Sequence, residues 1–152
     1  MSVEENIYDL IIIGAGPAGL TAGIYAARAR MKVLLIESLS IMGQATMTDS
    51  VENYPGLDDI NGFDLILNLK SQAENFGLIY TQDTITNIEK ESDTTWSLVG
   101  EKKYKAISVI IATGAQAKQL GVKGEIEKIG AGVSYCATCD AAFFKDKKII
   151  VV

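Results

Sequence analysis

Residues Ile11 to Gly19 read Ile-Ile-Ile-Gly-Ala-Gly-Pro-Ala-Gly, and this segment is the strongest indication of the fold class. The apolar run from Leu10 to Ile13 does not alternate with polar residues, which is typical of a parallel strand covered on both faces. We therefore expect a strand over Tyr8 to Ile13, a helix over Pro17 to Ala29 and a second strand over Lys32 to Ile36. The predicted fold class is α/β, a Rossmann-like FAD/NAD(P)-binding fold with a parallel sheet.

The glycine pattern G-x-G-x-x-G, placed between a strand and a helix, predicts a dinucleotide site. Gly14 allows the tight turn, Gly16 lets the backbone approach a pyrophosphate, and Gly19 permits close contact between helix and strand. The N–H groups and the dipole at the start of the helix favour the anionic pyrophosphate. Glu37 follows the second strand, where its carboxylate can accept hydrogen bonds from the hydroxyls of an adenosine ribose. A glycine-rich turn beside a surface Glu is the purely structural alternative.

The middle of the chain predicts a long loop and a further helix. The polar stretch from Gly43 to Gly62 is irregular, and loops of such length in compact domains are usually functional or disordered. From Phe63 to Phe76 apolar residues recur at intervals of three and four, which indicates one stripe of an amphipathic helix. The stripe consists of Phe63, Ile66, Leu69, Ala73 and Phe76.

A small antiparallel meander is expected after this helix, because short segments rich in Thr, Ile, Val and aromatic residues follow one another. Ser108 to Ala112 then predicts another buried strand, which leads into Ala112-Thr113-Gly114 at the strand end where ligands of open parallel sheets bind. The loop, the meander and this strand end favour FAD over NAD. The meander segments are Leu78 to Tyr80, Thr84 to Glu89, Thr95 to Val99 and Lys103 to Ile107.

Both cysteines of the chain lie in Cys136-Ala137-Thr138-Cys139, whose C-x-x-C spacing suits a reversible disulfide. A helix that begins near Cys139 would lower the pKa of a thiolate there. Asp140 follows, and because the chain contains no His, its carboxyl is the leading candidate to move the proton of dithiol–disulfide exchange. Half of a zinc site and two incidental buried thiols are the alternatives. A zinc site needs further Cys or His ligands, so no metal is expected.

Composition and charge exclude other classes of function. The chain has 152 residues, a formal net charge of −5 and no run of Lys or Arg, so nucleic acid is not an expected partner. Its apolar runs are too short to cross a bilayer, and Glu4 and Glu5 stand where a secretory signal has basic residues. We expect a cytoplasmic protein without a membrane partner. Lys147 to Val152 reads as the beginning of an apolar strand, which indicates the front part of a longer protein.

In this order the motifs resemble the N-terminal part of the low-molecular-weight thioredoxin reductases. The resemblance covers nearly the whole chain, and the Cys-Ala-Thr-Cys-Asp motif is its most specific part. The matching segments are Ile11 to Ala22, Gly43-Gln44, Glu52 to Gly56, Ile111 to Ala115 and Cys136 to Asp140.

The resemblance implies an enzyme in which NADPH reduces FAD, the flavin reduces a Cys136–Cys139 disulfide, and the dithiol reduces thioredoxin. In that family the second cysteine, here Cys139, lies against the flavin, the first, here Cys136, attacks thioredoxin, and the residue at Asp140 is the proposed acid. The implied FAD contacts are Gly14, Gly16, Pro17, Ala18, Glu37, Gly43, Gln44, Asn53, Ala112, Thr113 and Gly114.

The resemblance also assigns residues 1–115 to an incomplete FAD-binding domain and 116–152 to the start of a pyridine-nucleotide domain, and it suggests that the parent is a homodimer. Two alternatives stay open. One is a related flavin enzyme that uses ferredoxin or serves a peroxidase partner, although Cys-Ala-Thr-Cys favours thioredoxin. The other is a non-catalytic FAD-binding module.

Overall fold

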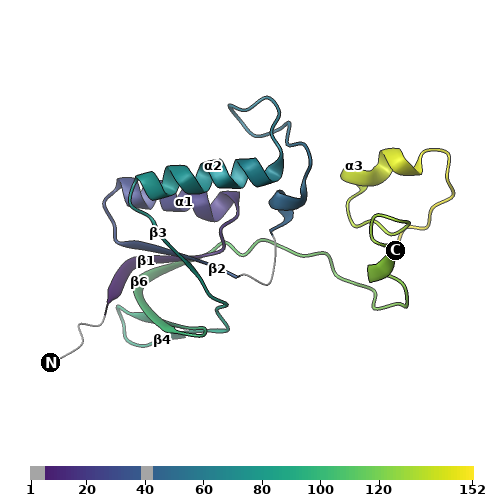
Figure 1. Ribbon diagram of the computed structural model, residues 1–152. Helices are drawn as coiled ribbons and strands as arrows, with labels where there is room; N and C mark the ends of the chain where they lie inside the picture. Colours follow the sequence, from purple (N-terminus) through teal and green to yellow (C-terminus); the bar gives the residue numbers. More distant parts are fainter. Residues whose placement is uncertain (1–5, 39–42) are drawn as a thin grey trace. The chain divides into compact units, whose positions relative to one another are not determined.

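The computed structural model describes residues 6–38 and 43–152, apart from the side chains of Thr138 and Cys139 (Figure 1). The chain forms two compact units that divide between Gly114 and Ala115. The ligand predicted for each unit stays a prediction.

The first unit contains a six-stranded sheet in the order β3-β2-β1-β6-β5-β4 (Figure 1). The neighbouring strands β3, β2, β1 and β6 run parallel to one another, whereas β5 pairs antiparallel with both β6 and β4. This arrangement confirms the predicted α/β fold with a parallel sheet and an antiparallel meander. The strands are β1 (Ile7–Ile13), β2 (Val33–Glu37), β3 (Ile79–Gln82), β4 (Asn87–Lys90), β5 (Trp96–Val99) and β6 (Lys103–Ile111).

Two helices, α1 (Pro17–Arg28) and α2 (Gly62–Asn75), lie side by side over one face of the sheet (Figure 1). Apolar side chains of β1, β2 and both helices form one core between these layers. The strands β1 and β2 contribute Leu10, Ile12, Val33 and Leu35 to this core, and the helices contribute residues that include Leu20, Ile24, Leu65, Leu69 and Ala73.

The predicted stripe of α2 is partly wrong. Leu69 and Ala73 are buried as expected, but Phe63 is 52% exposed and Phe76 is 45% exposed. Leu65 takes the buried position one turn before Leu69, since residues four apart share one helix face. The two Phe residues lie at the helix ends, beyond the reach of the core.

The strand after α2 does not belong to the meander, contrary to the prediction. β3 pairs parallel with β2, with Leu34 opposite Ile79 and Leu35 opposite Tyr80. The preceding helix carries the chain back across the sheet, which is the connection that a parallel strand requires. The meander therefore consists of β4, β5 and β6.

The predicted segments Lys103 to Ile107 and Ser108 to Ala112 form one strand, β6. The second of them is less buried than expected, because β5 pairs with β6 only as far as Ala106. Beyond that residue the described pairing of β6 is with β1, and Ile111 is 67% exposed.

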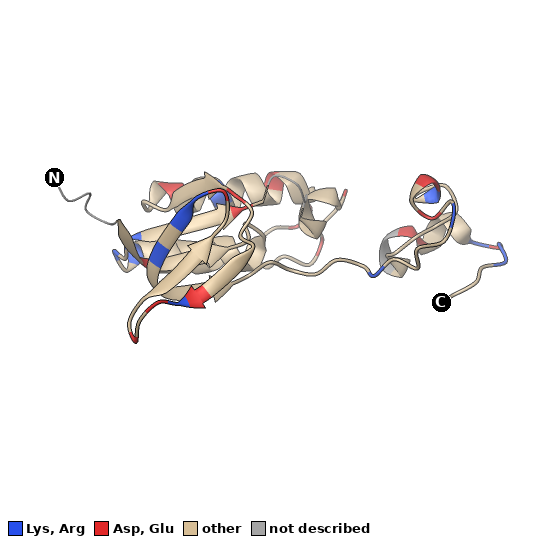
Figure 2. Ribbon diagram, turned by 90° about the horizontal axis from the view of Figure 1, so that it is seen from below, with Lys and Arg blue, Asp and Glu red and all other residues tan. Residues whose placement is uncertain are grey.

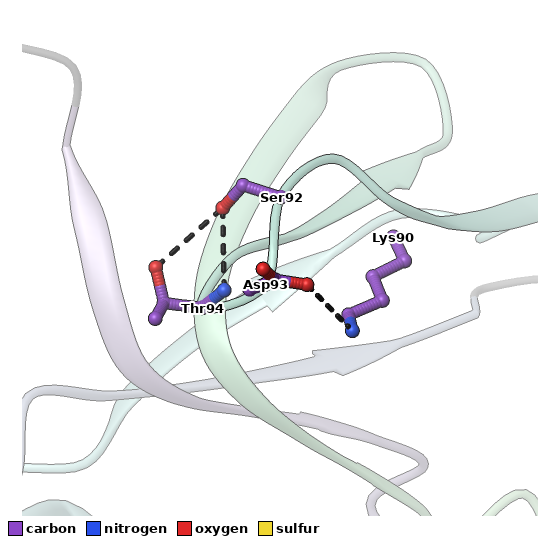
Figure 3. A network of polar contacts seen from close by, with 4 residues as sticks. All are labelled: Lys90, Ser92, Asp93 and Thr94. Atoms are coloured by element: carbon purple, nitrogen blue, oxygen red, sulfur yellow. Dashed lines mark hydrogen bonds and ion pairs between the residues drawn. The ribbon is translucent and has the colours of Figure 1, made fainter.

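Local polar contacts close the turn between β4 and β5 (Figure 3). The hydroxyl of Ser92 accepts a hydrogen bond from the N–H of Thr94 at 3.3 Å, and the ammonium of Lys90 lies 3.4 Å from the carboxylate of Asp93. The Asp93 side chain is fully exposed, so water screens this ion pair and its contribution to stability is small.

The second unit contains short helical turns: η2 (Ile126–Lys128), α3 (Ala137–Asp140) and η3 (Ala141–Phe144). The strand predicted over Lys147 to Val152 is not formed. The described residues there have no strand neighbour, and Ile150 is 90% exposed. A strand without a neighbour has no partners for its backbone groups, which explains the difference.

Charged residues of both signs are interspersed along both units (Figure 2). Among the described residues no helix is long and apolar enough to cross a membrane. The same residues contain no group of three or more His, Cys, Asp or Glu side chains that could hold a metal ion.

Candidate functional site

The glycine loop connects β1 to α1 and is closely fitted to its neighbours. The N–H of Gly14 donates to the carbonyl of Ile36 at 2.8 Å. Gly14 has φ +106°, and a Cβ there would lie 2.3 Å from the carbonyl oxygen of Ala112. A Cβ on Gly19 would lie 1.9 Å from the carbonyl oxygen of Gly14. The fold therefore requires glycine at both positions, as predicted for the tight turn and the helix–strand contact.

Gly16 differs from these two glycines. Its backbone has φ −72° and ψ 178°, which any residue can adopt, and a Cβ built on it meets no described atom within 4 Å beyond its chain neighbours. Packing against the described part of the chain therefore does not explain a glycine at this position. Pro17 is the first residue of α1, where a proline is favourable because the first N–H groups of a helix have no partner within it. The exposed Ala18 follows in the same turn.

Glu37 lies beside this loop. Its carboxylate accepts hydrogen bonds from the N–H of Ala15 and, at 2.9 Å, from the N–H of Ser38. A carboxylate has about four acceptor positions, so roughly two remain for other donors. The pKa of Tyr80 on β3 is raised, mainly by burial of the phenol and next by the negative charge of Glu37.

The carboxyl ends of three strands meet at this loop. Ile13 of β1 is in register with Ile36 of β2 and with Ile111 of β6. The N–H of Ala112 donates to the carbonyl of Ile13 at 2.8 Å, which places the Ala112-Thr113-Gly114 turn next to the glycine loop. The structure thus brings together the predicted residues of this edge: Gly14, Gly16, Pro17, Ala18, Glu37, Ala112, Thr113 and Gly114.

Gly43, Gln44 and Asn53 lie in the long loop before α2. Gly43 precedes the helical turn η1 (Gln44–Met47), and its carbonyl accepts hydrogen bonds from Thr46. The described hydrogen bonds of this loop hold it to itself and to the start of α2, where the N–H of Gly62 donates to the carbonyl of Thr48 at 2.8 Å. Asn53 is exposed. The FAD contacts assigned to these three residues stay a prediction.

The cysteine motif lies in the second unit. Cys136 is disulfide-bonded, and the chain's other cysteine is Cys139, whose side chain lies outside the described residues. The short helix α3 begins at Ala137, directly after Cys136, and contains Cys139. The lowered thiolate pKa that a helix start near Cys139 would cause stays a prediction. The N–H of Asp140 donates to the carbonyl of Cys136 at 3.0 Å. The backbone of Asp140 thereby contacts the motif, and the proton transfer assigned to its carboxyl stays a prediction.

Two buried carboxylates were not predicted from the sequence. Asp83, after β3, is 7% exposed and accepts four hydrogen bonds. Those from the N–H groups of Glu101 and Lys102 and the hydroxyl of Tyr104 measure 2.8, 3.1 and 2.8 Å. These hydrogen bonds lower the pKa of Asp83, and the one from the N–H of Glu101 has the largest effect. Burial and the hydrogen bond to Asp83 raise the pKa of Tyr104 to about 12.

Glu125 is the second unpredicted carboxylate and is 5% exposed. It accepts a hydrogen bond from the hydroxyl of Tyr135, the residue before Cys136. The segment Gly121-Val122-Lys123-Gly124-Glu125, with two glycines before an acid, is the signal in the sequence that could have indicated such a turn.

Comparison with known proteins assigns the chain to a group of enzymes. Residues 8–152 match the family described as pyridine nucleotide-disulphide oxidoreductase. A thioredoxin reductase of Listeria monocytogenes is 49% identical over 152 residues, which are 100% of this chain and 48% of that protein. The chain therefore spans about half the length of the curated relatives it matches.

Solved structures agree with this assignment. A thioredoxin reductase of Lactococcus lactis has a TM-score of 0.75 and 42% identity, covering 90% of this chain and 45% of that one. The thioredoxin reductase of Streptococcus pyogenes has a TM-score of 0.77 and 43% identity, covering 91% of this chain and 45% of that one. The sequence expectation of a thioredoxin reductase-like protein is confirmed.

Proposed function

Because the chain belongs to the pyridine nucleotide-disulphide oxidoreductase family, we propose that it is the FAD-binding and redox-active half of a thioredoxin reductase. The observation that carries this proposal is that one chain contains both an open glycine at the strand ends, Gly16, and a disulfide-bonded Cys136 in a C-x-x-C motif. The relatives and solved structures compared above are named thioredoxin reductases, which favours thioredoxin over the ferredoxin- and peroxidase-linked alternatives.

The residues of the first unit fit an FAD pyrophosphate and ribose. Among the described residues, apart from its chain neighbours, no atom lies within 4 Å of a Cβ on Gly16, so a pyrophosphate can approach its backbone. The partnerless N–H groups in the first turn of α1 and the helix dipole stabilise its negative charge. The remaining acceptor positions of Glu37 suit the ribose hydroxyls. FAD, when bound, supplies the electron pair that reduces the disulfide, and NADPH is the proposed source of that pair.

The cysteine pair performs the exchange with thioredoxin. The thiolate of Cys136 attacks one sulfur of the thioredoxin disulfide, forming a mixed disulfide, while the other thioredoxin sulfur leaves as a thiolate and takes a proton from Asp140. Cys139 then attacks the sulfur of Cys136, which restores the intramolecular disulfide and releases the second thioredoxin thiol. Two electrons and two protons pass to thioredoxin.

The full-length parent is proposed to be a cytoplasmic homodimer.

Trapping of the mixed disulfide tests this assignment on the chain itself. A reduced Cys139→Ser variant keeps the attacking thiol and lacks the resolving one, so we expect it to form a covalent adduct with oxidised thioredoxin, seen by mass spectrometry and released by dithiothreitol. The matched Cys136→Ser variant is expected to form several-fold less adduct. Equal trapping by both variants, or by neither, contradicts the roles proposed for the two cysteines.

A further inference from the structure

Glu125 is a charged side chain buried in the second unit, 5% exposed. One carboxylate oxygen accepts a hydrogen bond from the N–H of Leu120 at 2.8 Å. The other accepts from the N–H groups of Gly121 at 2.7 Å and Val122 at 3.2 Å. The hydroxyl of Tyr135 donates to the first oxygen. These four donors use the acceptor capacity of one carboxylate, so Glu125 is a fully satisfied buried anion.

The backbone around Gly121 is shaped for this anion. Gly121 has φ +75°, a left-handed conformation in which successive N–H groups can converge on one acceptor. The hydroxyl of Tyr135, followed by the backbone N–H groups, holds the pKa of Glu125 below its usual value. The bond to Glu125 raises the pKa of Tyr135. At neutral pH the contact therefore joins a carboxylate and a protonated phenol, which is a strong kind of hydrogen bond.

This contact fixes the residue that directly precedes Cys136. Between Glu125 and Tyr135 the chain folds back on itself, with a bridge between Ile129 and Val133. On its other side, the carbonyl of Cys136 accepts a hydrogen bond from the N–H of Asp140. The backbone at Cys136 is therefore held from both sides, by the Tyr135 contact and by the turn of α3.

We propose that the contact between Glu125 and Tyr135 positions Cys136 and thereby favours the closed disulfide over the open dithiol. The proposal rests on the redox role assigned to the cysteine pair above. A held backbone removes dithiol conformations in which the two sulfurs lie apart, which raises the effective concentration of one thiol at the other. Loss of the contact releases these conformations, so the equilibrium moves toward the dithiol.

Redox titration of the 152-residue chain tests the proposal. The chain is equilibrated in mixtures of reduced and oxidised dithiothreitol, and its thiols are alkylated and counted by mass spectrometry. In this exchange one dithiothreitol disulfide forms for each protein disulfide that opens to two thiols, so electrons and protons balance. For Tyr135→Phe, which removes only the hydroxyl, we expect a threefold to tenfold shift toward the protein dithiol, about 15–30 mV at 29.6 mV per tenfold.

Further variants separate positioning from general stability. Glu125→Gln keeps an acceptor oxygen and removes the charge, so its expected shift has the same direction, and the double variant shifts no further than the larger single one. Tyr104→Phe is the matched control, because Tyr104 also donates to a buried carboxylate, that of Asp83, but in the first unit. We expect Tyr104→Phe to lower the unfolding midpoint and to leave the redox equilibrium within twofold of the unchanged chain.

Two results overturn the proposal: shifts below twofold for both Tyr135→Phe and Glu125→Gln, or an equal shift for Tyr104→Phe. A different result identifies failure of the proposed function. If the cysteines of the unchanged chain do not open and close reversibly in these mixtures, the redox role itself is wrong, and the positioning proposal falls with it.

Discussion

Replacement of Gly19 by alanine tests whether the glycine loop is fitted to the sheet as described. A Cβ at Gly19 lies 1.9 Å from the carbonyl oxygen of Gly14, whereas contacts under 3.0 Å are essentially never seen for real Cβ atoms. Gly14 cannot yield easily, since its N–H is bonded to the carbonyl of Ile36 and its own Cβ position is blocked by Ala112. The start of α1 must therefore move away from β1 by roughly 1 Å, the shortfall in this contact.

The magnitude follows from two opposing effects. Overpacking of a well-packed site costs about 1–3 kcal/mol, and because both atoms in contact are held by the backbone, the upper end applies. Alanine in place of glycine inside a helix stabilises by about 1 kcal/mol. We expect Gly19→Ala to lower the free energy of unfolding by roughly 2 kcal/mol. Gly16→Ala is the matched control, and we expect it to change that free energy by between about 0 and +1 kcal/mol.

Urea unfolding followed by tryptophan fluorescence measures this difference, because the single Trp of the chain, Trp96, lies in β5 of the first unit. The slope of the unfolding free energy against urea should be the same for both variants, so that midpoints can be compared directly. Equal midpoints for Gly19→Ala and Gly16→Ala refute the reasoning, since the distances around the two glycines then do not determine stability.

Two other predictions concern side chains that accept backbone hydrogen bonds. Asp83→Asn is expected to lower the unfolding free energy at pH 7 by about 1–3 kcal/mol, since backbone donors lose their charged acceptor. The fold lowers the pKa of Asp83, so the stability that this carboxylate contributes is present above the usual pKa of 3.8 and is lost as the pH falls through the folded pKa. In Asp83→Asn the unfolding free energy should therefore fall less steeply with decreasing pH. An unchanged dependence of the unfolding free energy on pH argues against this carboxylate contact. Asn61→Ala removes the acceptor that binds the N–H of Asp64 at 2.8 Å and should cost about 1 kcal/mol in the same urea assay, whereas no loss would mean that this cap does not stabilise α2.

The β-α-β unit could be predicted from the sequence because its signals are local. A continuous apolar run, three glycines at fixed spacing and an acid after the next strand all lie between Leu10 and Glu37. Each of them has a structural cause that does not depend on distant parts of the chain, apart from the contact of Gly14 with Ala112.

The errors arose where pairing or packing depends on distant residues. The residue types predict a strand at Leu78 to Tyr80, which overlaps β3 (Ile79–Gln82), but the pattern does not tell parallel from antiparallel pairing. Asp83 and Glu125 look like ordinary surface acids in the sequence. Their burial depends on turns that converge on them, from Glu101 and Lys102 in one case and from Leu120 to Val122 in the other.

FAD titration of the unchanged chain and of Gly16→Ala shows whether the glycine loop binds the flavin. Binding is followed by the visible absorbance and fluorescence of the flavin, and urea unfolding shows that the variant remains folded. We expect one FAD bound per chain and at least a tenfold loss of affinity in Gly16→Ala, about 1.4 kcal/mol or more, because the added methyl group would stand where a pyrophosphate has to approach the backbone. Equal affinity of the two proteins, or no FAD bound by the unchanged chain, would contradict the claim that this glycine loop forms the flavin site.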